Sequence, residues 1–368
     1  MAHNQRYLTN SKDMINTRDI TIAGAGPAGL TAAIILAKAG CRVQVFEQHS
    51  GVGRRFNDDF QGLENWSREE DVLEEVTAMG ISPESWWHRT FYGGVLYDPS
   101  LRPIRVQSER PLFYMVRRGH THPASLDLAL LDQAREAGVE FVWNQRLGAP
   151  AANIVASGPC GVPMAIARGM TFHTELEDLA CGILNDEMAP AGYVYFLVAD
   201  HQATLATVLF EKFGEARNCL GSSLDGIKRL YAIKEMDEVR YWGGYAFFNL
   251  PTSCSRNGSL WIGEAAGFQD NLFGFGIRNA LVSAKLAAQS IIENRSYDAL
   301  WRARLLPHLK ATLVSRTGYQ GLGDFAKRGF WHLTGKNARP DRFMRWLYNF
   351  SPLHRALYPL ALTRLPKG

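Results

Sequence analysis

The chain has few of the features that mark secreted, membrane-spanning or metal-binding proteins. It contains five cysteines in 368 residues, an odd number with no C-x-x-C pair, so we expect neither a disulfide framework nor a metal site. It has no run of about 18 uncharged apolar residues, and its first residues are polar, unlike a signal peptide. The net charge of +4 gives no reason to expect a nucleic-acid partner. We therefore expect a cytoplasmic globular protein.

A glycine-rich segment near the start of the chain, DITIAGAGPAGLTAAIILAKAGCRVQVFE, carries the first positive signal. A short apolar strand over 20–23 leads into G-x-G-x-x-G, and a helix over about 27–39 follows. In this pattern the first glycine permits a tight turn, the second leaves room for a pyrophosphate, and the third lets the helix pack closely. The residues concerned are Gly24, Gly26, Pro27, Ala28 and Gly29. The pattern predicts a dinucleotide site at the N-terminus of this helix.

An acidic residue, Glu47, closes the strand that follows the helix. A carboxylate about 20 residues beyond the glycines accepts hydrogen bonds from a ribose 2′-hydroxyl, and it would repel a 2′-phosphate. The segment therefore disfavours NADP at this site and leaves FAD and NAD open.

A second glycine-rich segment, GSLWIGEAAGFQDNLFGFGIRNALVSAKLAA, follows much later in the chain. It resembles the second FAD motif of the superfamily of geranylgeranyl reductases and para-hydroxybenzoate-hydroxylase-type monooxygenases, which reads roughly IGDAAGF-x-x-P-x-x-G-x-G-I-x-x-A. The chain departs from this pattern at Glu264, where the family has Asp, and at Asn271, where it has Pro. The matching residues include Ile262, Gly263, Ala265, Ala266, Gly267, Phe268, Gly274, Gly276, Ile277 and Ala280.

The resemblance implies an α/β fold: an FAD-binding Rossmann-like domain of the glutathione-reductase type, interwoven with a mixed β-sheet substrate domain and followed by a helical C-terminal region. We expect the FAD domain over 17–80, 111–165 and 255–296, the substrate domain over 81–110 and 166–254, and the helical region over 297–368. FAD would be bound non-covalently. Arg118 matches an arginine of the family, and Arg54 or Arg55 stands where relatives place a basic residue against the FAD phosphates.

The same resemblance implies an oxidoreductase, and the sequence AAGF at 265–268 favours the geranylgeranyl reductases within the superfamily. The predicted reaction is reduction of C=C bonds in a lipophilic or isoprenoid-like substrate, with NAD(P)H as a transient electron donor. A monooxygenase that uses NAD(P)H and oxygen is the alternative, and a lipid carrier of related fold without flavin is the third. Reduction of an alkene also needs a proton, for which Tyr193 and Tyr195 are the predicted donors.

The C-terminal region is basic and carries two amphipathic patterns. Phe343, Trp346, Leu347 and Phe350 follow helical spacing, with Pro340 suited to the first turn. Nine basic residues accompany a single acid, Asp341: Lys327, Arg328, Lys336, Arg339, Arg342, Arg345, Arg355, Arg364 and Lys367. Such helices either dock on the substrate domain and close its pocket, or lie on an anionic membrane as a peripheral contact.

Overall fold

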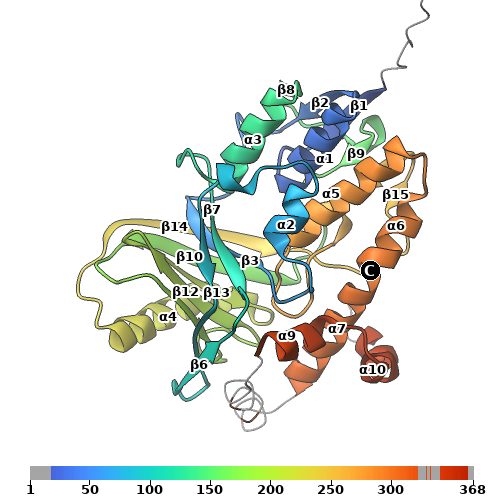
Figure 1. Cartoon of the computed structure of the whole chain (residues 1–368). Coiled ribbons are helices and arrows are strands. Elements are labelled where there is room, and N and C mark those ends of the chain that lie inside the picture. The colour runs from blue at the N-terminus through green and yellow to red at the C-terminus, as the bar shows by residue number, and fades with distance from the viewer. Residues whose placement is uncertain (1–17, 322–328, 330–331, 333–339, 364–368) are drawn as a thin grey trace, which may run out of the picture.

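The computed structural model describes residues 18–321, 329, 332 and 340–363 (Figure 1). Residue 17, where the FAD domain was predicted to begin, lies outside these residues. So do six of the nine basic residues of the C-terminal region: Lys327, Arg328, Lys336, Arg339, Arg364 and Lys367.

The first sheet is the parallel sheet that the opening motif predicts. Its strand order is β15-β16-β9-β1-β2-β8, and all neighbours are parallel except β15 and β16. Strands β1 and β9 come from segments more than a hundred residues apart, so the sheet is assembled from separated parts of the chain. The strands are β1 (Asp19–Ala23), β2 (Arg42–Phe46), β8 (Glu140–Val142), β9 (Ile154–Val155), β15 (Ser255–Arg256) and β16 (Ser259–Trp261).

Three helices pack together with this sheet: α1 (Pro27–Lys38), α3 (Leu126–Glu136) and α5 (Ile277–Ile292). Helix α1 contacts both α3 and α5. Ser125 caps α3, as its position before a helical apolar pattern predicts, because its Oγ accepts a hydrogen bond from the amide of Leu128 at 3.2 Å. The core between sheet and helices is the largest cluster of buried apolar side chains among the described residues.

The second sheet has the order β14-β10-β13-β12-β11-β5-β6, with one parallel pair, β11 and β5, among antiparallel neighbours. Helix α4 (Ala216–Tyr231) packs against β10 and β13. The strands are β5 (Gly93–Tyr97), β6 (Pro103–Gln107), β10 (Ala165–His173), β11 (Leu179–Ile183), β12 (Tyr193–Ala199), β13 (Gln202–Leu209) and β14 (Asp237–Ala246).

A small antiparallel sheet connects the two larger ones. It consists of β3 (Asp59–Glu64), β7 (Phe113–Arg118) and β4 (His88–Phe91), and helix α2 (Val72–Thr77) follows β3. Leu63 and Val116 belong to the core of the first sheet, while Phe60 and Met115 pack with Leu197 of β12. Strand β4 pairs with β7 here, although its residues fall inside the range 81–110 predicted for the substrate domain.

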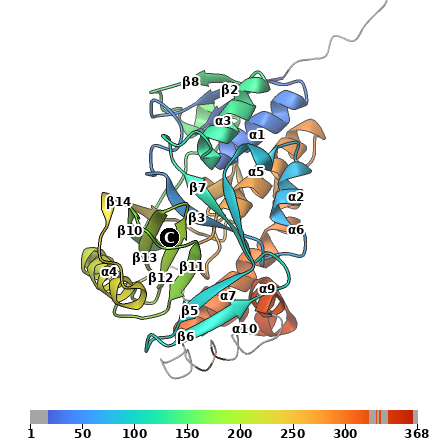
Figure 2. The ribbon, with the colours of Figure 1, turned by 60° about the vertical axis from the view of Figure 1, so that its left-hand side comes forward.

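The C-terminal region is helical, with α6 (Tyr297–Arg304), α7 (Leu306–Gly321), α9 (Pro340–Tyr348) and α10 (Pro352–Leu362). Helices α9 and α10 pack against α7 at the end of the molecule far from β1 and β2 (Figure 2). Leu347 is buried, as docking on the protein requires, but Trp346 is 41% exposed and Phe350 lies beyond the end of α9, so the expected apolar face is only partly buried. No helix in the described part of the chain is both long and apolar enough to span a bilayer.

Candidate functional site

One cavity of about 850 Å³ connects the first glycine motif with the seven-stranded sheet. This volume lies in the upper part of the range of roughly 300–1,000 Å³ usual for ligand pockets. Every strand of that sheet contributes a side chain to the lining, and these are mostly apolar: Val95, Val106, Ala165, Ala180, Tyr195, Val208 and Trp242. Met344 of α9 also lines the cavity, so this helix takes part in closing it.

The three glycines of the first motif meet different surroundings. A Cβ at Gly24 would lie 2.3 Å from the carbonyl oxygen of Ala156, and one at Gly29 would lie 2.0 Å from that of Gly24. Both positions therefore require glycine because other backbone passes too close. A Cβ at Gly26 would meet no protein atom within 4 Å. The space beside Gly26 is thus open to the cavity that it lines.

The N-terminus of α1 faces this open space without a side chain to cap it. Gly26 is the N-cap residue, and Pro27 and Ala28 in the first turn line the cavity. The free amides of such a terminus favour an anionic group. Glu47 follows β2, and its Oε2 accepts a hydrogen bond from the amide of Ala25 at 2.9 Å, so the acid and the glycine loop are held together at one end of the cavity.

The second glycine segment lies directly against the first. Gly263 opens a short 3₁₀ turn, and a Cβ built on it would lie 2.8 Å from the Cβ of Ala28. Gly267 and Gly274 adopt φ angles of +83° and +79°, which L side chains rarely tolerate. Gly276 caps α5, which begins at Ile277 as predicted. Gly274, Gly276 and Ile277 all line the cavity.

Asp270 shapes the loop between this turn and α5, a role that was not predicted from the sequence. Its carboxylate accepts hydrogen bonds from the amides of Leu272, Phe273 and Phe275 at 2.6–2.8 Å. The side chain is buried, and burial raises its pKa to about 6. An Asp at the start of a turn is the signal that would have indicated it.

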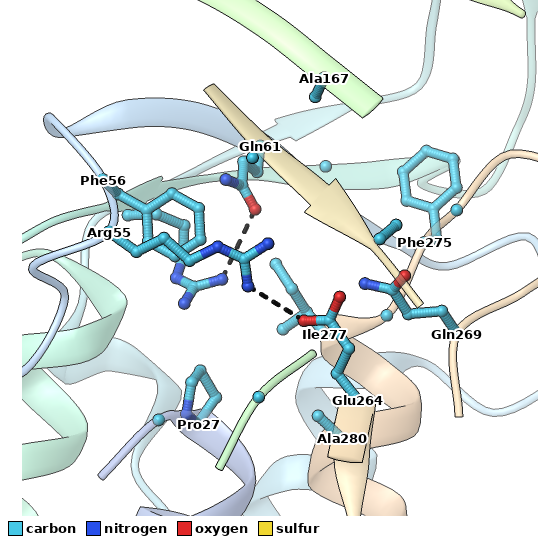
Figure 3. Close-up of a pocket in the computed structure, with 18 of the residues that line it drawn as sticks. Pro27, Arg55, Phe56, Gln61, Ala167, Glu264, Gln269, Phe275, Ile277 and Ala280 are labelled. Carbon is cyan, nitrogen blue, oxygen red and sulfur yellow. Dashed lines mark hydrogen bonds and ion pairs between the residues drawn. The ribbon is translucent and has the colours of Figure 1, made fainter. Parts of the chain in front are cut away.

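Glu264 and Arg55 form an ion pair inside the cavity (Figure 3). Arg55 Nη1 donates to Glu264 Oε2 at 3.1 Å, and Arg55 Nη2 donates to the carbonyl oxygen of Tyr245 at 2.6 Å. The other carboxylate oxygen accepts from the amide of Phe247 at 3.3 Å. Burial raises the pKa of Glu264, and the positive charge of Arg55 opposes that rise. The glutamate at this position is therefore held by protein groups from two other segments.

The other predicted arginines differ in environment. Arg54 is exposed at the rim of the cavity. Arg118 is 7% exposed and makes a two-pronged ion pair with Asp127, with N–O distances of 2.8 and 2.9 Å. Asp127 also accepts from the amide of Gly119 at 3.0 Å, so this pair fixes the end of β7 beside the cavity.

Both predicted proton donors line the cavity from β12. The hydroxyl of Tyr193 donates a hydrogen bond to the carbonyl oxygen of Phe273 at 2.6 Å, which ties the sheet to the loop before α5. Burial raises the pKa of both phenols above the usual value. The two side chains therefore stay protonated at neutral pH.

Two glutamines in the cavity wall were not predicted as site residues from the sequence. Gln61 of β3 donates from Nε2 to Asp59 Oδ2 at 2.9 Å, and burial raises the pKa of Asp59 to about 6. Gln269 has a buried Oε1 without a hydrogen-bond partner. Figure 3 shows both amides among the residues that surround the cavity. Only the alternation of a polar residue within the buried strand could have indicated Gln61.

Comparison with known proteins agrees with the predicted fold class. A family model described as an NAD(P)-binding Rossmann-like domain matches residues 22–63. The structure is similar to that of a geranylgeranyl bacteriochlorophyll reductase-like protein from Thermoplasma acidophilum, with a TM-score of 0.69, 18% identity, and coverage of 95% of this chain and 96% of that one. The flavin-dependent brominase Bmp2 also matches, with a TM-score of 0.66, 16% identity, and coverage of 94% and 98%. These likenesses establish the fold.

Among curated proteins, the chain is similar to digeranylgeranylglycerophospholipid reductase 1 of Methanopyrus kandleri. The two are 27% identical over 312 residues, which cover 75% of this chain and 80% of the relative. The digeranylgeranylglycerophospholipid reductase of Haloferax volcanii is 26% identical over 365 residues, covering 82% of this chain and 85% of the relative. The resemblance predicted from the two glycine-rich segments is thereby confirmed.

Proposed function

We propose that this protein is an FAD-dependent oxidoreductase that reduces C=C bonds of a lipophilic, isoprenoid-like substrate with electrons from NAD(P)H or a protein carrier. The observation that carries the proposal is the cavity described above, because it joins a dinucleotide-type glycine loop at one end to an apolar sheet surface at the other. A cofactor bound at the first end and an apolar chain lying on the second would meet inside it.

The residues present fit FAD. The open space beside Gly26 and the uncapped α1 terminus suit a pyrophosphate, with Arg54 at the rim, and Glu47 lies where a ribose would follow. The amides at the start of α5 suit negative charge on a reduced flavin ring. When bound, FAD would supply hydride transfer, while the chain orients the substrate and excludes water. The residues proposed for binding are Gly24, Gly26, Pro27, Ala28, Gly29, Glu47, Arg54, Arg55, Arg118, Gly263, Glu264, Gly267, Gly274, Gly276 and Ile277.

The substrate class is proposed from the apolar wall and from the names of the relatives, which are reductases of digeranylgeranylglycerophospholipids. The test is to load the purified protein with FAD, reduce it anaerobically with NADPH, NADH or dithionite, and add a geranylgeranyl lipid. Reoxidation of the flavin with formation of saturated product supports the proposal. Reoxidation only by oxygen, with hydrogen peroxide and an oxygenated product, indicates the monooxygenase instead. Failure to bind FAD at all indicates a carrier.

The two predicted proton donors can be separated by substitution. Tyr195→Phe is expected to slow alkene reduction at least about 10-fold, since a positioned acid contributes roughly 10²–10⁴-fold. Tyr193→Phe is expected to have a smaller effect on that rate, because the Tyr193 hydroxyl already donates its hydrogen bond to the carbonyl oxygen of Phe273. Stopped-flow reoxidation of reduced flavin by substrate measures both rates. Tyr241→Phe, at a tyrosine that is 63% exposed, is the control. An unchanged rate in Tyr195→Phe would remove Tyr195 as the donor.

We also propose that the C-terminal helices contact anionic membranes peripherally. Leu353, Leu357 and Leu360 of α10 are 43–59% exposed, and Arg355 on the same helix is also exposed. Exposed leucines beside basic residues favour binding at a lipid surface. Sedimentation with vesicles of anionic lipid should pull down the protein, and the triple replacement of these leucines by serine should abolish it. Equal pelleting of both proteins would contradict this role of α10.

A further inference from the structure

Among the described residues, three that line the cavity carry a buried polar side-chain atom without a hydrogen-bond partner: Trp66, Trp242 and Gln269. In the two tryptophans this atom is the indole nitrogen, which can only donate. In Gln269 it is Oε1, so this oxygen is the acceptor of the set. A buried polar group that stays unpaired is costly, and such a group in a binding cavity therefore indicates a ligand that brings a donor.

The backbone on both sides of Gln269 is held in place. The amide of Phe268 donates to the carbonyl oxygen of Gly263 at 3.1 Å, and the amide of Asp270 donates to that of Phe275 at 2.9 Å. Phe268 and Asp270 are themselves buried, at 0% and 1% exposed. Gln269 therefore extends into the cavity from a fixed turn, which is what a preorganised binding group requires.

The side chain of Gln269 lies beside the first turn of α5. A Cβ built on Gly276, the residue before this helix, would lie 2.7 Å from Gln269 Cγ and 3.0 Å from Nε2. The glutamine can take this position only because Gly276 has no side chain. Figure 3 shows its amide directed into the cavity. Gln269 thus adjoins the end of α5 that suits the ring of a bound flavin.

The chemistry of a flavin complements that of a glutamine side chain. The ring system of oxidised flavin has one hydrogen-bond donor, the N3–H group of its pyrimidine, which lies between the carbonyl groups at C2 and C4. A glutamine amide carries one acceptor and one donor group side by side. Its oxygen can accept from N3–H while its nitrogen donates to a neighbouring carbonyl oxygen. The dimethylbenzene edge of the ring has no such groups, so this contact distinguishes the two ends of the ring.

Gln61 also lines the cavity, but both ends of its amide already have protein partners. Its Nε2 donates to Asp59 Oδ2 at 2.9 Å, and its Oε1 accepts from Arg118 Nη1 at 3.5 Å. Gln61 is therefore the same side chain, in the same cavity, without an unpartnered acceptor. This makes it a matched control for Gln269.

We propose that Gln269 binds the pyrimidine edge of the flavin through N3–H and so sets the orientation of the ring in the cavity. This role rests on the proposed function, because it requires FAD. It assigns to a side chain of the loop before α5 a contact with the cofactor itself. The expected effect is therefore on cofactor affinity, and it does not depend on which substrate or electron donor the protein uses.

The test measures the dissociation constants of the apoprotein for FAD and for 3-methyl-FAD, in which a methyl group replaces the hydrogen on N3, by fluorescence titration. Wild type should bind the analogue at least about 10-fold more weakly than FAD, because Oε1 stays unpaired. Gln269→Leu removes the amide at similar size, and it should bind FAD and the analogue with nearly equal affinity. The ratio of the two constants cancels the bulk of the methyl group, which both proteins must accommodate.

Two further variants separate the hydrogen bond from other effects. Gln269→Glu keeps an acceptor at this position and should still prefer FAD. Gln61→Leu should keep the wild-type preference. The inference is overturned if Gln269→Leu retains that preference, or if wild type binds FAD without discriminating against the analogue. A wild type that binds neither cofactor would overturn the proposed function itself. Discrimination without any alkene reduction would overturn only the proposed reaction.

Discussion

Gly26→Ala is expected to leave the protein folded and to weaken FAD binding about 10- to 100-fold. The backbone at Gly26 has φ −79° and ψ 178°, which alanine adopts freely, and the added Cβ would meet no protein atom within 4 Å. It would instead occupy space where the pyrophosphate must approach the helix terminus, and an added methyl group in a packed site costs about 1–3 kcal/mol. Fluorescence titration of the apoprotein with FAD measures the loss.

Two other glycines make this result diagnostic. Gly29→Ala places a Cβ 2.0 Å from the carbonyl oxygen of Gly24, so it should reduce the yield of folded protein, which Gly26→Ala should not. Gly221→Ala, in helix α4 where a Cβ also meets nothing within 4 Å, should leave both folding and FAD binding unchanged. If Gly26→Ala bound FAD as tightly as Gly221→Ala, the cofactor would not pass beside Gly26.

Arg118→Met is expected to destabilise the protein by about 3–5 kcal/mol, the cost usual for breaking a buried ion pair on one side. Asp127 is 1% exposed and would lose both of its guanidinium hydrogen bonds while it stays surrounded by protein. The double variant Arg118→Met with Asp127→Asn should recover much of the loss, because the buried charge is gone and an amide oxygen can still accept from Gly119. Urea unfolding of the three proteins gives the comparison.

An exposed pair provides the control for this prediction. Arg42 and Asp19 also form a two-pronged pair, with N–O distances of 2.8 and 2.7 Å, but their side chains are 67% and 63% exposed. Solvent screens such a pair, so Arg42→Met should change the unfolding midpoint little. Equal urea unfolding midpoints for Arg42→Met and Arg118→Met would show that burial does not make the Arg118–Asp127 pair more important for stability than the exposed pair.

Local patterns predicted much of the architecture. The strand, glycine loop and helix at 19–38, the cap at Ser125 and the start of α5 at Ile277 all depend on neighbouring residues, whose spacing can be read directly. The two glycine-rich segments also predicted one shared binding site, because each end of a dinucleotide is bound by a short sequence motif. The domain boundaries and the individual binding roles stay predictions.

The sequence by itself determined the fold class and both glycine loops, since turns that need φ above zero and uncapped helix termini are local requirements. Only the tertiary structure decided which charges meet. Arg55 pairs with Glu264 across 209 positions, β4 joins β7 in the small sheet, and Glu64 becomes buried near Arg68 and Arg278, which come from two separate segments. These outcomes depend on strand pairing and burial between distant segments, for which a linear sequence carries no periodic signal.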